Sequence, residues 1–214
     1  MFEMVETWVQ IVILIFCLGF ALTCAIMKKN ELWVLLTFFY GSYLLGDLYW
    51  AFNILFFGKT PDISLISDFS WYTMYLFLFL MFRYAFAKHG YLKVVSKKPI
   101  FFVIPVVGPV FTALMAAFYM QYGSYFSNVV YALLMGMLLY ALIYVFLNFK
   151  VIKSKSFRAL CYLTLLLCVA EYGAWTMSCF FTEPTISNPF YIFDMLLTLI
   201  FPAYIPIISK EVES

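Results

Sequence analysis

The sequence has 214 residues, of which 66% are hydrophobic, 22% are aromatic and only 11% are charged. Because soluble domains carry charge on about 25% of their residues, this composition excludes a soluble globular protein and predicts a bundle of membrane-spanning helices. The net charge is only +2, and no basic stretch is interleaved with aromatic residues, which argues against a nucleic-acid partner.

Seven apolar segments are each about long enough to cross a hydrocarbon core of ~30 Å as a helix. They cover residues 7–27, 32–57, 67–87, 99–121, 125–149, 157–181 and 190–208. The expected fold is therefore all-α, a single seven-transmembrane-helix domain over residues 1–214, in which short loops make successive helices antiparallel neighbours. The acidic start of the chain and the length of the first segment favour a retained helix over a cleaved signal peptide.

The basic residues predict how this bundle is oriented. Twelve of the thirteen Lys and Arg residues fall on one side of a seven-pass bundle, in or next to the first, third and fifth loops and after the last segment, and only Lys59 lies on the other side. Loops rich in Lys and Arg remain in the cytoplasm. We therefore expect a multi-pass protein of the plasma membrane with its N-terminus outside and its C-terminus in the cytoplasm. The same alternation favours seven spans over six or eight.

Cysteine and histidine give no indication of a metal or cofactor. All five cysteines lie in apolar segments, where an odd number is typical of packing residues and not of disulfides or metal ligands. His89 is the single histidine, too few for bis-histidine haem ligation, and its place in the basic third loop predicts a solvated side chain. The last segment has no mid-membrane lysine, only Lys210 near its inner end, which excludes a retinal Schiff base.

Carboxylic acids are the strongest candidates for a functional site. Asp47, Glu171 and Asp194 lie inside apolar segments, and Asp68 opens the third. Charged groups at membrane depth are costly and mark functional sites by default. Helical rise places all four in the outer half of the membrane. Since no Lys or Arg lies deep in any segment, these acids are expected to bind a proton or an external cation.

Aromatic residues accompany each acid at helical spacing. The expected lining of the site is Tyr43 and Trp50 with Asp47, Tyr72 and Tyr75 with Asp68, Trp175 with Glu171, and Tyr191 with Asp194. Such a set predicts an outward-facing pocket for a small cationic or polar ligand, such as an amine, a metal ion or a sugar. The structural alternative is that each acid is hydrogen bonded to a neighbouring helix. For Asp68, or Ser67 beside it, a further alternative is the N-cap of the third helix.

Two segments carry a resemblance to a known class of membrane region. Gly46-Asp-Leu-Tyr-Trp50 and Ser67-Asp-Phe-Ser-Trp71-Tyr-Thr-Met-Tyr-Leu-Phe-Leu resemble the multi-pass sensor regions that precede diguanylate cyclase or histidine kinase domains in Gram-positive bacteria. This resemblance implies a bacterial sensor. No output domain follows the last predicted helix within these 214 residues, so signalling would pass through a separate partner protein.

A second resemblance rests on Leu45-Gly-Asp47-Leu, which is similar to the Gly-Asp segment of the lysoplasmalogenase family of membrane hydrolases. It implies a lysolipid substrate, with Asp47 and Asp194 as the catalytic acid and base. Members of that family generally have eight passes, whereas seven are predicted here. A cation- or proton-coupled transporter is the third hypothesis, although no clear internal repeat supports it. A binding or sensing protein is favoured, and enzymatic activity is left open.

Overall fold

The computed structural model describes residues 2–60, 65–181 and 187–214, and every regular element within these ranges is helical. The long helices are α1 (Phe2–Lys28), α2 (Glu31–Phe57), α3 (Leu65–Lys88), α6 (Val107–Tyr119), α7 (Tyr125–Leu147), α8 (Lys155–Phe180) and α9 (Phe190–Glu213). The short elements are α4 (Tyr91–Val94), α5 (Ile100–Val103) and the 3-10 helix η1 (Ile104–Val106). The expectation of an all-helical chain is confirmed for these residues.

Local sequence signals explain where several helices begin and end. Asn30 starts α2, since its side chain accepts a hydrogen bond from the backbone N–H of Leu32 at 2.9 Å. Ser124 and Ser154 cap α7 and α8 in the same way. Gly58 ends α2 with a φ of 70°, a left-handed conformation that glycine adopts without steric cost.

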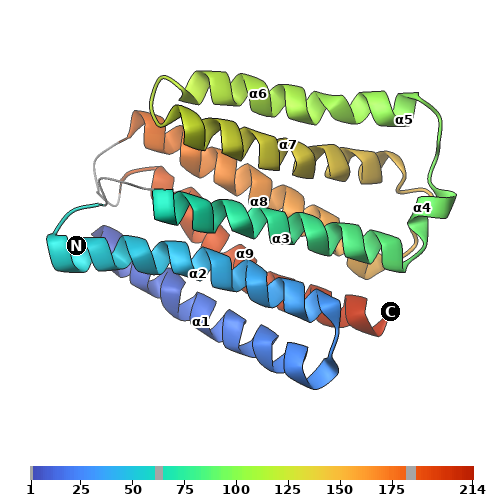
Figure 1. Cartoon of the computed structure of the whole chain (residues 1–214), viewed down its shortest axis with the longest axis horizontal. Coiled ribbons are helices and arrows are strands. Elements are labelled where there is room, and N and C mark those ends of the chain that lie inside the picture. Colours follow the sequence, from blue (N-terminus) through green and yellow to red (C-terminus); the bar gives the residue numbers. More distant parts are fainter. Residues whose placement is uncertain (1, 61–64, 182–186) are drawn as a thin grey trace.

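The long helices lie side by side along one common direction (Figure 1). Sequential neighbours pack as antiparallel pairs, namely α1 with α2, α2 with α3, α6 with α7, and α8 with α9. Helix α9 returns to α1 and α2, while α3 contacts α7 and α8. Six helices (α1, α2, α3, α7, α8 and α9) thereby surround one core, and α6 lies outside them against α7.

Six segments are long and apolar enough to cross a membrane, namely α1, α2, the continuous stretch Ile100–Tyr119 that includes α6, α7, α8 and α9. Large hydrophobic side chains on their outer surfaces, such as Phe16 (74% exposed) and Leu199 (71% exposed), are consistent with contact with lipid. The expectation of a membrane helix bundle is therefore supported for six of the seven predicted spans.

Helix α3 differs from the other six. It has 24 residues, a length similar to its neighbours, but its described residues are not apolar enough to count as a candidate span. The polar residues responsible include Asp68, Ser70 and Arg83. Asp68 and Ser70 are buried where α3 packs against α2 and α7, so protein surrounds these two side chains.

The two ends of the bundle differ in the charged residues that they carry. The loop before α2, the α3–α4 corner, the start of α8 and the C-terminus gather at one end (Figure 1), which we call the basic end. The residues there (28–31, 83–99, 150–158 and 210–214) include twelve of the thirteen Lys and Arg side chains. The opposite end, where α1, α3, α7 and α9 begin, is called the acidic end.

Candidate functional site: a buried carboxyl cluster

Four carboxyl groups from four helices come together near the acidic end. Asp47 of α2 interacts electrostatically with Asp194 of α9 and with Glu171 of α8. Glu6 of α1 is in hydrogen-bonding contact with Asp194 and also interacts electrostatically with Asp47. We call Glu6, Asp47, Glu171 and Asp194 the acid cluster. The structure thus brings together the three deep acids identified from the sequence and adds a fourth.

The donors recorded for these acids are all electrically neutral. The indole Nε1 of Trp71 donates to Asp47 Oδ1 at 3.1 Å. The Gln10 Nε2 amide donates to Asp194 Oδ1 at 3.4 Å and to Thr198 Oγ1 at 2.9 Å. Tyr75 of α3 is hydrogen bonded to Glu171. Neutral donors orient the carboxyl groups, but they do not cancel the repulsion between them.

Several carboxyl oxygens of the cluster are left without a partner among the described residues. They are Asp47 Oδ2, Glu6 Oε1 and Glu171 Oε1, all of them buried atoms. Asp47 itself is only 3% exposed. A buried polar atom without a hydrogen bond is costly, and two carboxyl groups in contact must share a proton or hold a cation between them. The arrangement therefore suits a positively charged occupant.

The kind of occupant is limited by geometry. In the part of the chain that the structure describes, no group of three or more His, Cys, Asp and Glu side chains is arranged to hold a metal ion. Two cavities, one at the basic end and one between α6 and α7, contain no acid of the cluster among their lining residues. Neither of these two cavities therefore includes the acid cluster.

Glu6 was missed from the sequence because the first helix was expected to begin at residue 7, and Gln10, inside that segment, is not one of the acids on which the predicted site was based. The structure begins α1 at Phe2, which places Glu3 and Glu6 within the helix. Glu3, Glu6 and Gln10 then recur at intervals of three and four residues, which puts them on one face. That spacing could have identified these residues as one face of the first helix from the sequence alone.

The expected aromatic lining is partly in place. Tyr43 is buried and interacts electrostatically with all four acids of the cluster. Tyr191 interacts with Glu6 and Asp194. Trp50 donates from Nε1 to Glu3 Oε1 at 3.3 Å, so it lies beside the cluster. Trp71, which was not predicted to belong to the site, packs against both Tyr43 and Trp50. Its ring centroid lies 6.3 Å from that of Tyr43 and 5.9 Å from that of Trp50.

Gly46 allows this arrangement because it leaves room for Trp71. A Cβ atom at position 46 would lie 2.5 Å from Trp71 Nε1, closer than real contacts allow. The indole can therefore reach Asp47 only because residue 46 has no side chain. This contact joins the two segments, around Gly46 and around Trp71, on which the resemblance to sensor regions rests.

Asp68 and Tyr72 lie elsewhere, in the contact between α3 and α7. The Ser127 hydroxyl donates to Asp68 Oδ2 at 2.7 Å, and the Tyr72 hydroxyl donates to the Ser127 carbonyl at 3.1 Å. Neither Asp68 nor Ser67 is the N-cap of α3, because the helix already begins at Leu65 and Asp68 lies in its first turn. A carboxylate there is favourable because it faces the positive end of the helix dipole.

Trp175 is also outside the acid cluster. It stacks on Tyr131 of α7, with ring centroids 4.7 Å apart and planes 17° apart. The spacing of Glu171 and Trp175 did place both on the inward side of α8, but Trp175 turns toward α7. Spacing within one helix could not distinguish these two directions.

The basic end holds a different carboxyl site, built around Glu211 of α9. The Glu211 side chain is fully buried, and its Oε1 contacts His89 Nε2. The hydroxyls of Ser154 and Ser156 donate to Oε2 at 3.2 Å and 2.5 Å. The expectation that His89 is a solvated loop residue is therefore wrong, since its side chain is only 16% exposed. Glu211 follows the last predicted span, and for that reason it was not identified as a buried acid.

No family model, curated protein or solved structure matches the chain.

Proposed function

We propose that this is a multi-pass plasma-membrane protein that binds a small cation at the acid cluster and acts as a binding or sensing module. The observation that carries this proposal is a cluster of four carboxyl groups, in which Asp47 is buried and the other three are half-buried. Their hydrogen-bond donors among the described residues are neutral, and three of the four acids keep a buried oxygen without a partner there. In such surroundings a cation supplies the charge that the protein does not.

The proposal includes seven spans, with α3 as the third, and the acidic end outside the cell. Two features support it. Helix α3 lies alongside α2 for its length (Figure 1) and is covered by neighbouring helices, so it can contain polar residues at membrane depth. The concentration of Lys and Arg at the basic end favours that end as the cytoplasmic one.

The size of the occupant follows from the packing. Asp47 and Tyr43 are both nearly fully buried, and Trp71 occupies the space beside Gly46. A monovalent metal ion or the ammonium group of a small amine fits this setting better than a sugar.

The proposal is tested by thermal unfolding of the purified protein in detergent, with sodium, potassium and methylammonium as separate titrants. We expect at least one of them to raise the melting temperature of the wild type, because a ligand that binds only the folded state stabilises it. The variant Asp47→Asn, Glu171→Gln, Asp194→Asn should lose that response.

The matched control is Asp68→Asn, which removes a buried carboxyl near the same end but outside the acid cluster. It should retain the cation response even if it unfolds at a lower temperature. An equal loss of response in the control and in the triple variant would contradict the proposal, as would a wild type that responds to no cation.

A lysolipid hydrolase is the second candidate, favoured by the interaction between Asp47 and Asp194. Two interacting carboxyl groups can act as a general acid and base. This candidate predicts the release of an aldehyde from a lysoplasmalogen, abolished by Asp47→Asn. A folded, cation-responsive preparation that releases no aldehyde would eliminate it and leave the binding proposal intact.

A further inference from the structure

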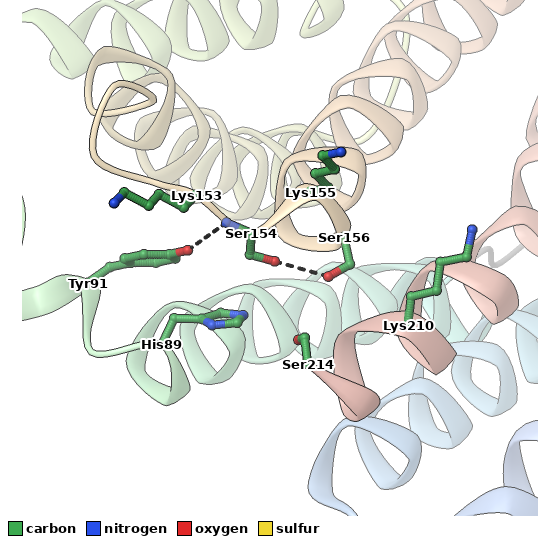
Figure 2. Close-up of a pocket in the computed structure, with 8 residues that line it drawn as sticks. All are labelled: His89, Tyr91, Lys153, Ser154, Lys155, Ser156, Lys210 and Ser214. Carbon is green, nitrogen blue, oxygen red and sulfur yellow. Dashed lines mark hydrogen bonds between the residues drawn. The ribbon is translucent and has the colours of Figure 1, made fainter.

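A cavity opens at the basic end, where the α3–α4 corner, the start of α8 and the end of α9 meet. Its volume is about 520 Å³, within the range of small-molecule sites. Three lysines line it, Lys153 and Lys155 at the start of α8 and Lys210 on α9 (Figure 2). All three are exposed, and their ammonium groups point in different directions in the structure (Figure 2). Because lysine side chains are long and flexible, they can turn toward one anion.

The acidic side chain next to this cavity is that of Glu211, and neighbouring donors partly compensate its charge. Glu211 is fully buried and is already engaged by His89, Ser154 and Ser156. It lies behind the lining and not in it, and these donors partly offset its charge. The lysines are therefore the main charged groups that face the cavity.

Neutral donors complete the lining. The Tyr91 hydroxyl accepts a hydrogen bond from the Ser154 backbone N–H at 3.0 Å, which leaves its own O–H to donate. At the start of α8, Ser154 satisfies the N–H groups of Phe157 and Arg158. The N–H groups of Lys155 and Ser156 are the two remaining first-turn donors, and both residues line the cavity.

We propose that this cavity binds a phosphate group on the basic side of the membrane. Lysines, a tyrosine hydroxyl and first-turn N–H groups together match the charge and the several acceptor oxygens of a phosphate. The phosphate can belong to an anionic lipid headgroup or to a soluble phosphate compound, because the same donors recognise both. The site lies at the opposite end from the acid cluster and does not depend on the function proposed for that cluster.

The test compares two triple variants of the full chain that each remove three positive charges from the basic end. Lys153→Gln, Lys155→Gln, Lys210→Gln alters the cavity. Lys93→Gln, Lys97→Gln, Lys98→Gln is the matched control, since these three lysines are exposed and do not line the cavity. All six positions lie on the surface, so both variants should fold.

Binding is measured at 0.15 M salt with two probes, inorganic phosphate added to the detergent-solubilised protein, and nanodiscs of phosphatidylglycerol compared with phosphatidylcholine. Thermal unfolding and native mass spectrometry report the bound phosphate or retained lipid. We expect the cavity variant to bind at least tenfold more weakly and the control to change less than threefold. Salt screens the general effect of net charge.

The two probes distinguish the source of the phosphate. A response to inorganic phosphate supports a soluble ligand, and selective retention of phosphatidylglycerol supports a lipid headgroup. Equal weakening in both variants would overturn the proposal, because it would show only a diffuse electrostatic attraction. Binding of neither probe by the wild type would also overturn it.

Discussion

Helix α9 carries a carboxyl group near each end, and the two have opposite surroundings. Glu211, at the basic end, is engaged by one histidine and two serine hydroxyls. Asp194, at the acidic end, lies among three other carboxyl groups and accepts a hydrogen bond from the Gln10 amide. A buried acid with a full set of donors holds a structure together. A buried acid that faces other acids is costly unless something positive binds there.

The largest expected effect is at Glu211, where the carboxyl group has a full set of donors. Glu211→Ala removes the shared acceptor of three side chains and leaves His89 and two serine hydroxyls without it. We expect a loss of about 3 kcal/mol in the free energy of unfolding, as for other broken buried polar networks. Reversible unfolding in mixed micelles measures this loss. The control, Glu213→Ala, removes an exposed acid that pairs with Lys28 at 3.8 Å. This substitution should change the free energy of unfolding little.

Gly46→Ala tests the packing that orients the acid cluster. The added methyl group would displace the Trp71 indole and break its hydrogen bond to Asp47. We expect a loss of about 2 kcal/mol, typical of overpacking in a close contact, together with a change in tryptophan fluorescence. Gly19→Ala is the control, because a Cβ atom there meets nothing within 4 Å. If Gly46→Ala caused no loss in the free energy of unfolding, the position of Trp71 would not depend on the absence of a side chain at residue 46.

Ser127→Ala tests whether Asp68 is structural. The substitution removes the hydroxyl that donates to Asp68 Oδ2 at 2.7 Å. We expect a loss of about 1 kcal/mol, the usual net contribution of a buried hydrogen bond, with the cation response retained. Ser178→Ala should have a smaller effect, because that hydroxyl is exposed and bonds to the Trp175 carbonyl of its own helix. A lost cation response in Ser127→Ala would place Asp68 in the functional site.

Asp47→Asn should have the smallest effect on stability, and it should not destabilise the protein as Glu211→Ala does. It removes a carboxyl group from a repulsive cluster and keeps an oxygen to accept the Trp71 hydrogen bond. In the absence of a cation, we expect the free energy of unfolding to be unchanged or to rise by about 0.5 kcal/mol. A destabilisation as large as that of Glu211→Ala would erase the distinction between the two ends.

Much of this architecture could be predicted from the sequence, because long apolar segments and short polar loops leave few folds for a membrane bundle. The inward position of Asp47, Glu171 and Asp194 could also be predicted, since deep acids avoid lipid. Helix spacing alone did not separate Asp68 from this group. Its partner is Ser127 of α7, and that contact depends on how α3 and α7 are rotated against each other.

Glu6 and Glu211 show a second limit. Both lie close to the ends of helices, where the apolar pattern fades and a charged residue is normally taken to be in water. The structure extends α1 back to Phe2 and α9 on to Glu213, and so carries both acids into contacts between helices. Their burial depends on those contacts, which no local pattern in the sequence specifies.

The account is tested most directly by infrared difference spectra of the protein in lipid, recorded with and without the cation that stabilises it. If the acid cluster binds that cation, the spectrum should contain a carboxyl band that is absent from Asp47→Asn and unchanged in Glu211→Gln. A spectrum without any carboxyl band, or one whose band depends on Glu211 and not on Asp47, would contradict the assignment of the functional site to the acid cluster.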